Sequence, residues 1–433
     1  MWRRCRRWTN LRPRTYPCYM KVPAIARSTQ PSLRPPMKYK FALPALVVPL
    51  LLAMTRTANN AFLMRTRTFL LPLLVALGVL SGKASGQATR ATLDIYIVDT
   101  EGGKATLFVS PAGQTVLIDT GNPGARDLER IMDVISSSGA RKIDYLISTH
   151  YHTDHIGGLE ALAKRIPVAH FMDHGASVEA REMVAGFQAA YADIHAKARH
   201  TVLRAGDRIP LKGLDWRIVT SAGKAITTPL PGAGQLNAKE CAAFQRHTDA
   251  ASPDDNGQSV GSVITFGRFR AIDLGDLLWN NEFDLVCPRN QVGTADLYLV
   301  THHGLDQSGS PALVHAIRPR VAIMQNGTRK GGAPATYQTL RGTPGLEDIW
   351  TMHWSYSAGM EYNSAGVFIA NIEDKMALAT ALNDPAGAQG DPAHTPAYSM
   401  KVSARTNGTF TVTNSRNGFS KTYVRAPGAR LRP

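Results

Sequence analysis

Apolar residues in the first half of the chain fall into short runs that are separated by glycine, proline and polar turns. Runs rich in β-branched and aliphatic residues between such breaks are typical of strands. They lie at 93–98, 105–109, 115–118, 143–147 and 168–172. Residues 126–138 instead place apolar side chains at helical spacing, which predicts an amphipathic helix. We expect further helices over residues 159–165 and over the Ala-rich stretch 178–200.

The second half of the chain repeats this alternation. Strand-like runs lie at 214–219, 260–266, 269–274, 296–300, 321–324, 367–372 and 376–380. Helical patterns lie at 312–317 and 334–341. Two similar halves of mixed strands and helices predict an α/β fold, and an αββα sandwich accommodates both halves.

The composition changes near the C-terminus. Residues 383–396 are rich in Pro, Gly, Ala and Asp, which predicts a linker. Asn407-Gly408 is a strong turn signal between the strand-like runs 398–404 and 409–413, so a β-hairpin is expected there. We therefore expect one main domain over residues 87–385, followed over residues 386–433 by a linker, a small hairpin appendage and a basic tail.

Positive charge is concentrated at the N-terminus. The formal net charge is +16, but the first 86 residues hold eleven Arg, four Lys and no Asp or Glu, so the remainder is close to neutral. A nucleic-acid-binding protein needs basic residues on its folded surface. The charge distribution therefore argues against a nucleic-acid partner.

The basic N-terminus has the pattern of a targeting segment. Residues 64–86 combine a basic start, a twelve-residue apolar run and small residues, which predicts a signal peptide cleaved near Gly86. The apolar run is shorter than the roughly 20 residues that span a bilayer, so no stable membrane span is expected in the mature chain. We expect export to the periplasm or secretion. The alternative to a cleaved signal peptide is an N-terminal membrane anchor built from this run and the run 41–54. Residues 1–63 are interpreted as an upstream extension, basic and disordered.

Two of the four cysteines, Cys241 and Cys287, lie beyond the leader. In an exported protein they can form one disulfide, and the sequence leaves this open. Neither lies in a segment with metal-ligand spacing, so we expect a structural role for both. The sequence does not predict the oligomeric state.

The most specific chemistry lies in residues 149–155 (Thr-His-Tyr-His-Thr-Asp-His), directly after the strand-like run 143–147. A loop at the end of a buried strand can point several side chains at one place. Imidazole suits zinc and neighbouring transition metals, and a carboxylate can complete a second site. The full His-x-His-x-Asp-His spacing, followed by Gly157-Gly158, is far more specific than a lone His-x-His pair.

With three further segments, this motif makes the chain resemble the metallo-β-lactamase-fold superfamily of metal-dependent hydrolases. The resemblance is strongest to the branch related to the metallohydrolase domain of ComEC competence proteins. The supporting segments are 115–121 (Thr-Val-Leu-Ile-Asp-Thr-Gly), 274–276 (Leu-Gly-Asp) and 300–304 (Val-Thr-His-His-Gly). The resemblance covers residues 91–382 and implies a four-layer αββα metallo-β-lactamase-like sandwich.

The resemblance also implies which side chains bind metal. His150 and His152 would bind one ion, and Asp154 and His155 would bind a second. Asp276 would bridge both ions from the end of a strand. The cofactor implied is Zn²⁺, as one or two ions, with Mn²⁺ as the alternative.

Two further positions follow from the resemblance. The last metal histidine would be His303, with His302 as its rival because consecutive side chains on an extended segment point in opposite directions. Asp119 would support a metal-binding histidine through a hydrogen bond, which fixes the tautomer and the orientation of the imidazole ring. A turn carboxylate before Gly121 is the alternative interpretation.

One departure from the family pattern concerns the first ion. Many members carry another histidine roughly twenty residues before the bridging aspartate, but here residues 253–259 read Pro-Asp-Asp-Asn-Gly-Gln-Ser. Asp255 or Asn256 could supply an oxygen ligand there, and His247 is a less well placed candidate. An oxygen in place of imidazole would open the site to manganese as well as zinc. The acidic pair could also form a solvated turn.

These features predict an exported metal-dependent hydrolase that uses metal-bound hydroxide on an ester, lactone, amide or phosphodiester. Asp154 and Asp276 would be the catalytic residues, and the expected partner is a small-molecule substrate. A nuclease or phosphodiesterase of ComEC-like type is one alternative, and a non-catalytic binding protein on a decayed metallohydrolase scaffold is another. Residues 257–261 match the Gly-x-Ser-x-Gly pattern by chance, since a polar loop precedes Ser259 and a strand follows it.

Overall fold

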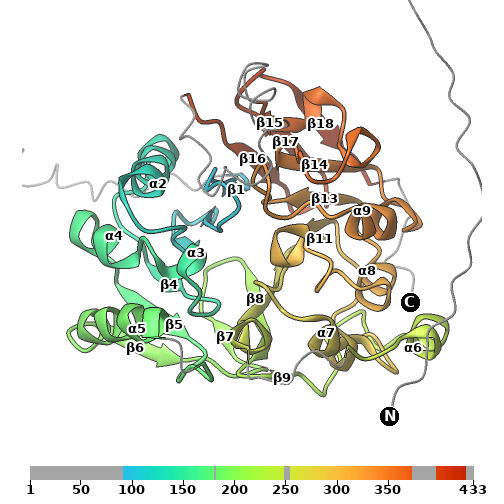
Figure 1. Ribbon diagram of the computed structural model, residues 1–433, viewed down its shortest axis with the longest axis horizontal. Coiled ribbons are helices and arrows are strands. Elements are labelled where there is room, and N and C mark those ends of the chain that lie inside the picture. Colours follow the sequence, from blue (N-terminus) through green and yellow to red (C-terminus); the bar gives the residue numbers. More distant parts are fainter. Residues whose placement is uncertain (1–90, 180–181, 248–253, 373–395, 426–433) are drawn as a thin grey trace, which may run out of the picture. The chain divides into compact units, whose positions relative to one another are not determined.

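The computed structural model describes residues 91–425, apart from 180–181, 248–253 and 373–395 (Figure 1). The predicted signal peptide, the upstream extension and the strand-like run 376–380 lie outside the described residues. So do nearly all of the predicted linker and the end of the basic tail.

One nine-stranded sheet holds the strands of the first half together with those of the C-terminus. Its order is β18-β17-β16-β1-β2-β3-β4-β5-β6. The strands from β18 to β3 are antiparallel, and those from β3 to β6 are parallel. The bounds are β1 Leu93–Ile97, β2 Thr106–Val109, β3 Thr115–Ile118, β4 Tyr145–Ile147, β5 His170–Asp173, β6 Arg199–Val202, β16 Met400–Ala404, β17 Phe410–Asn414 and β18 Ser420–Tyr423.

The second sheet contains the strands in between. Its order is β15-β14-β13-β12-β11-β10-β8-β7, with β9 paired to β8. The strands from β11 to β15 are parallel, so their C-terminal ends lie along one edge. The bounds are β7 Arg208–Ile209, β8 Asp215–Ser221, β9 Lys224–Ala225, β10 Gly261–Phe266, β11 Phe269–Asp273, β12 Leu297–Leu299, β13 Val321–Met324, β14 Asp348–His353 and β15 Ile369–Asn371.

Helices cover the outer face of each sheet, on opposite sides in Figure 1. On the first sheet they are α2 (Ala125–Ser138), α4 (Leu159–Arg165) and α5 (Glu182–His195); on the second they are α6 (Ala238–Ala243), α7 (Trp279–Val286), α8 (Pro311–Ile317) and α9 (Pro334–Arg341). The short helices are α3 (Thr153–Ile156), η1 (Asp255–Gln258), η2 (Thr301–Gly304), η3 (Met360–Tyr362) and η4 (Gly366–Phe368).

Three apolar layers hold the sandwich together. The central one joins the inner faces of the two sheets, where Phe108 of β2 meets Trp216 of β8 with 4.9 Å between ring centroids. The outer layers pack helices on each sheet, for example Ile131 of α2 on one side and Leu313 of α8 on the other. The predicted αββα arrangement is confirmed.

The predicted C-terminal hairpin is present as β16 and β17, but it is not a separate appendage. β16 pairs with β1 along five residues, and β18 extends the sheet further. Phe410 and Tyr423 are 1% exposed, and Trp350 of the other sheet donates from Nε1 to Tyr423 Oη at 2.9 Å. These strands therefore form part of the sandwich core.

The long helix predicted over residues 178–200 is shorter in the structure. It is α5, which ends at His195, and residues Arg199–Val202 instead form the edge strand β6. The polar sequence of β6 carries no strand alternation. Helix α7 and strand β14 were not predicted, although Trp279, Phe283 and Val286 of α7 recur at helical spacing and Ile349–Met352 of β14 is a mostly apolar run.

Two further features bear on the expectations from sequence. Cys241 of α6 and Cys287, directly after α7, form the disulfide that the sequence left open. Within the described residues, none of the helices combines the length and the apolar composition required to cross a bilayer.

Candidate metal centre

The histidine motif turns sharply out of the first sheet. The chain leaves β4 at Ile147 and re-enters helical structure at α3, whose N-cap is His152. The turn needs the two glycines that follow α3. A Cβ atom on Gly157 would lie 2.3 Å from the Thr153 carbonyl oxygen, and one on Gly158 would lie 2.3 Å from the Thr120 carbonyl oxygen. The close approach of these backbones explains the Gly-Gly pair in the motif.

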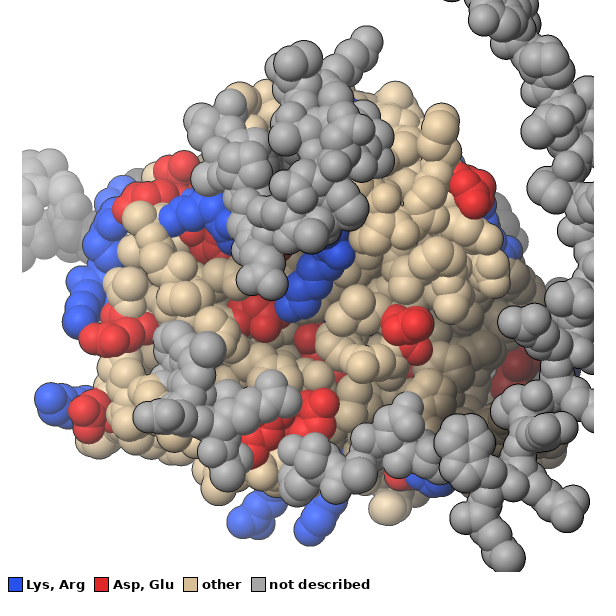
Figure 2. Space-filling model, viewed as in Figure 1, with Lys and Arg blue, Asp and Glu red and all other residues tan. Residues whose placement is uncertain are grey.

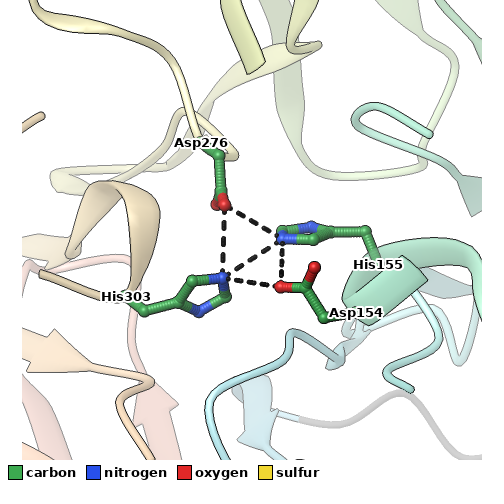
Figure 3. A group of neighbouring side chains, drawn as sticks. All are labelled: Asp154, His155, Asp276 and His303. Carbon is green, nitrogen blue, oxygen red and sulfur yellow. Dashed lines mark hydrogen bonds and ion pairs between the residues drawn. The ribbon is translucent and has the colours of Figure 1, made fainter. Parts of the chain in front are cut away.

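Four side chains from distant parts of the sequence converge at one point. Asp154 and His155 come from α3, Asp276 follows β11, and His303 lies in η2 after β12 (Figure 3). Their ligand atoms all lie within 4.8 Å of one another. His155, Asp276 and His303 are buried and Asp154 is half-buried.

The distances within this cluster fit one bound transition-metal ion. His155 Nε2 lies 3.2 Å from His303 Nε2, 3.1 Å from Asp276 Oδ2 and 3.3 Å from Asp154 Oδ2. His303 Nε2 lies 3.2 Å from Asp276 Oδ2 and 3.1 Å from Asp154 Oδ2. A tetrahedral ion with bonds of about 2.0 Å has ligand–ligand edges of about 3.3 Å. Five of the six ligand–ligand distances match these edges, and the sixth, between Asp154 and Asp276, is within 4.8 Å.

Both imidazole rings are oriented by hydrogen bonds on the side away from the cluster. The Nδ1 atom of His155 lies 2.8 Å from Asp119 Oδ2, and that of His303 lies 3.1 Å from the Gln325 carbonyl oxygen. Asp119 also accepts from the Thr149 backbone N–H and hydroxyl, each at 2.8 Å. These acceptors place the proton on Nδ1 and leave the Nε2 lone pair facing the centre, as in metal-binding histidines.

Acidic side chains and imidazoles lie in contact within the cluster, and each shifts the pKa values of its neighbours. Burial alone would lower the pKa of His155, but Asp276, Asp154 and Asp119 outweigh it and raise this pKa well above its usual value. Burial would raise the pKa of Asp276, but His155 and its neighbouring histidines hold it well below the usual range. The pKa of Asp154 is lowered in the same way, and Lys330 contributes to this shift.

Two lysines lie beside the cluster. Lys330, on the loop that follows β13, places its Nζ against Asp154 Oδ2, while its own side chain is 40% exposed. Lys104, just before β2, is buried and contacts Asp273 at the end of β11. Acidic side chains also gather near the middle of the face in Figure 2, between the two groups of helices.

The other predicted metal ligands do not join these four. His302 Nε2 lies 3.6 Å from Asp276 Oδ2, and its Nδ1 atom lies 3.1 Å from the Ser308 hydroxyl. Burial lowers the pKa of His302 to about 4. His152 turns its Nε2 atom toward Glu179 Oε1, at 2.9 Å.

His150 is fully buried beside the cluster, and its ring centroid lies 4.1 Å from that of His155. Its Nδ1 atom lies 3.1 Å from the Thr149 hydroxyl. Within the described part of the chain, His150 Nε2 and Asp276 Oδ1 have no hydrogen-bond partner. Two unpartnered buried ligand atoms next to a formed site fit a second ion there.

Asp255 lies at the first turn of η1 and faces backbone rather than the cluster. Its Oδ2 atom accepts from the Tyr151 N–H at 2.8 Å and lies 3.1 Å from His174 Nε2, and its Oδ1 atom accepts from the Val178 N–H at 3.2 Å. The structure therefore does not bring Asp255 together with Asp276. Ser259 lies between a 3-10 turn and β10, and its hydroxyl accepts from the Asp276 N–H at 3.1 Å.

Comparison with protein families places these residues in a known context. The model of the metallo-beta-lactamase superfamily matches residues 99–327, more than half of the chain, and this range includes all four side chains of the cluster. The chain belongs to the metallo-beta-lactamase superfamily. Members of this superfamily are generally metal-dependent hydrolases that bind divalent ions, and the cluster gives this member residues of the right kind.

Curated relatives narrow the position within the superfamily. The competence protein ComA of Neisseria gonorrhoeae is 24% identical over 222 residues, which cover 51% of this chain and 25% of ComA. The beta-lactamase-like protein 2 homolog of Caenorhabditis elegans is 28% identical over 72 residues, 15% of this chain and 24% of that protein. The chain thus spans about a quarter of the length of these relatives. The match to ComA confirms the ComEC-like resemblance.

Solved structures of the superfamily are more distant. The metal-dependent hydrolase Tm1679 is 12% identical, with a TM-score of 0.37, and the match covers 61% of this chain and 97% of that one. A diphosphatase of the PhnP family is 14% identical, with a TM-score of 0.33, and the match covers 60% of this chain and 94% of that one. Nothing follows for activity from such distant matches.

Proposed function

We propose that this protein is an exported metal-dependent hydrolase that acts on a small or medium-sized ester, lactone, amide or phosphodiester. The observation that supports it most directly is the mutual spacing of the ligand atoms of Asp154, His155, Asp276 and His303, which is 3.1–3.3 Å for five of the six pairs. Structural ion pairs rarely bring two imidazole nitrogens to 3.2 Å from each other and both to the same two carboxylates.

These four residues would hold a divalent ion, with zinc favoured by the two imidazole ligands and manganese as the alternative. A bound divalent ion of this kind lowers the pKa of water and polarises a carbonyl or phosphoryl oxygen. The protein contributes orientation: Asp119 and Gln325 fix the two rings, and Ser259 fixes the backbone of Asp276. Burial of the ligands keeps competing water away from them.

Lys330 would assist with substrate. Its ammonium group lies against Asp154 at the partly exposed side of the cluster. Once a divalent ion occupies the carboxylate, this lysine is available to a negatively charged group on the substrate. The loop thus favours substrates with a carboxylate or phosphate.

A second candidate function is a metal-dependent nuclease or phosphodiesterase. The match to ComA over half of the chain is the observation that favours it. The near-neutral charge of residues beyond the leader speaks against a long nucleic acid as substrate. This candidate predicts cleavage of DNA or of bis-aryl phosphates, preferentially with manganese.

Metal analysis of the purified mature chain tests the proposal. We expect one to two transition-metal ions per chain, and a sharp fall in metal content in Asp276→Ala and His155→Ala. The matched controls are Asp284→Ala and His315→Ala, which remove the same kinds of side chain from ion pairs with Arg246 and Glu240 outside the cluster. A panel of lactone, β-lactam, bis-aryl phosphate and DNA substrates then separates the two functions.

Near-zero metal in wild-type protein purified without chelator would contradict the proposal and support a binding protein on a decayed scaffold. Full activity in His303→Ala together with loss in His302→Ala would reverse the assignment within that pair. Export is tested separately, by N-terminal sequencing of the protein from the native host, with Gln87 as the expected first residue.

A further inference from the structure

The turn that leads into the metal cluster is held by two carboxylates from outside it. Residues 148–152 join β4 to α3 without regular secondary structure. Asp119, directly after β3, accepts from the Thr149 N–H at 2.8 Å. Asp255, the first residue of η1, accepts from the Tyr151 N–H, also at 2.8 Å. Both carboxylates are fully buried, so the backbone of the turn is fixed at two positions.

The Tyr151 N–H lies only a few residues before two of the ligands. The next residue, His152, is the N-cap of α3, and its carbonyl oxygen accepts from the N–H groups of His155 and Ile156 at 3.0 and 3.1 Å. Helix α3 carries Asp154 and His155 into the cluster. A shift of the backbone at Tyr151 would therefore move the start of α3, and with it both of these ligands.

Asp255 is itself anchored on its other side. Its Oδ2 atom also lies 3.1 Å from His174 Nε2, and its Oδ1 atom accepts from the Val178 N–H at 3.2 Å. The Asp255 N–H donates to Glu179 Oε1 at 2.9 Å. His174, Val178 and Glu179 belong to the segment between β5 and α5. Asp255 thus joins this segment to the turn that precedes α3.

The ring of His174 completes the connection. It packs against the ring of Tyr151 with 4.6 Å between centroids, and the Tyr151 hydroxyl donates to the Gly175 carbonyl oxygen at 2.6 Å. His174 and Tyr151 are both buried. Water therefore cannot replace the Asp255 carboxylate as their acceptor, and its removal would leave buried donors unmet, which is costly.

The same contacts give Asp255 a role other than that of a ligand. Its two oxygen atoms are committed to Tyr151, His174 and Val178. None of the metal-capable groups in the described part of the chain includes Asp255. The oxygen ligand that the sequence offered is thus a hydrogen-bond acceptor for the backbone beside the ligands.

We propose that Asp255 is a positioning residue, which through the Tyr151 N–H fixes the turn that places Asp154 and His155 at the metal centre. This rests on the metal-dependent function proposed above. Hydrogen-bonded partners that hold metal ligands in place typically contribute about 10–100-fold to metal affinity or activity. Asp119 acts on the imidazole of His155, whereas Asp255 would act on the backbone before α3.

Two substitutions separate a positioning role from a ligand role. Asp255→Asn keeps an oxygen that can accept from the Tyr151 N–H, whereas Asp255→Ala removes it. In the full mature chain, we expect Asp255→Ala to raise the dissociation constant for Zn²⁺ by about 10–100-fold, measured by competition with a chromophoric chelator. Asp255→Asn should stay close to wild type. His174→Ala should give a smaller loss than Asp255→Ala, because the Tyr151 N–H keeps its acceptor.

The visible absorption of bound Co²⁺ provides a readout that a loss of stability alone would not move. It should change in Asp255→Ala, where the ligands on α3 are displaced, and return to the wild-type spectrum in Asp255→Asn. Asp144 is the matched control, because its Oδ2 atom accepts from the Thr115 N–H at 2.9 Å at the opposite end of β4. Asp144→Ala should lower the melting temperature and leave the zinc affinity and the cobalt spectrum unchanged.

The outcomes separate this inference from the proposed function. Equal losses of zinc affinity in Asp255→Asn and Asp255→Ala would overturn the positioning role and indicate a ligand. Wild-type affinity and spectrum in a folded Asp255→Ala would overturn it too. If Asp255→Ala fails to fold, wild-type affinity in Asp255→Asn with a partial loss in His174→Ala supports the role, and any other pair of results overturns it. Absence of metal from wild type would instead contradict the proposed function.

Discussion

Replacing Lys104 by methionine tests how far a buried ion pair beside the cluster stabilises the fold. Lys104 is 3% exposed, and its Nζ contacts Asp273, which ends β11 in the other sheet. The Lys104 backbone N–H donates to the Asp154 carbonyl oxygen at 3.0 Å, and Asp273 Oδ1 accepts from the Gly275 N–H at 3.0 Å. The pair therefore contacts the segment that carries Asp154 and the segment that carries Asp276.

The expected loss of stability follows from the burial of this ion pair. Desolvation alone would lower the pKa of Lys104, but Asp273, Asp119 and Asp276 outweigh it and raise this pKa. A raised lysine pKa stabilises the fold below the unfolded-state value near 10.5, and this stabilisation is lost as pH rises through the folded-state pKa. Near neutral pH, methionine would thus leave Asp273 buried and uncompensated. We expect the free energy of unfolding to fall by about 3–5 kcal/mol.

Urea unfolding near neutral pH, followed by the fluorescence of the buried Trp216 and Trp350, measures this loss. Lys401→Met is the matched control, because Lys401 pairs with Asp94 at 3.0 Å in the same sheet but is 40% exposed. Its loss should stay below about 1 kcal/mol. The double variant Lys104→Met/Asp273→Asn should be more stable than Lys104→Met. Equal losses in the two single lysine variants would refute the reasoning.

Three further predictions concern other parts of the sandwich. Burial raises the pKa of Glu282 to about 7 from 4.5. Because Glu282 ionises at lower pH in the unfolded chain, up to about 3 kcal/mol of stability should be lost as pH rises across that window. Glu282→Gln should flatten this pH dependence in urea titrations, and an unchanged slope would contradict it. Cys241→Ser opens a loop of 46 residues and should lower stability by about 2–4 kcal/mol under oxidising conditions only. Lys330→Gln should tighten divalent-ion binding several-fold, measured by dialysis, while it raises KM for anionic substrates but not for neutral ones.

Much of the fold could be predicted because its signals are local. The strands β1, β3, β10 and β13 are short aliphatic runs between glycine or polar turns, and α2 has one apolar stripe. The motif 149–155 is local too, since it holds four candidate side chains within six residues, and two of them, Asp154 and His155, lie in the cluster.

Contacts between distant segments carried no such signal. Glu179 meets His152 across a turn that looked like the start of a helix, and Lys104 meets Asp273 from the other sheet. Neither side chain stands in a motif, and a buried lysine looks like any other lysine in sequence. Likewise, the polar run Arg199–Val202 becomes a strand because β5 offers a free edge, which no local pattern records.

The pairing of Leu93 with Ala404 has a consequence for biosynthesis. Until the last strands have been made, β1 exposes an open edge, and the apolar faces of β1 and β2 lack part of their cover. During synthesis, the polypeptide is therefore prone to aggregation until its C-terminal strands are available to pair with β1. A C-terminal deletion that removes β16–β18 should therefore abolish soluble expression of the protein, even though it keeps all four side chains of the cluster.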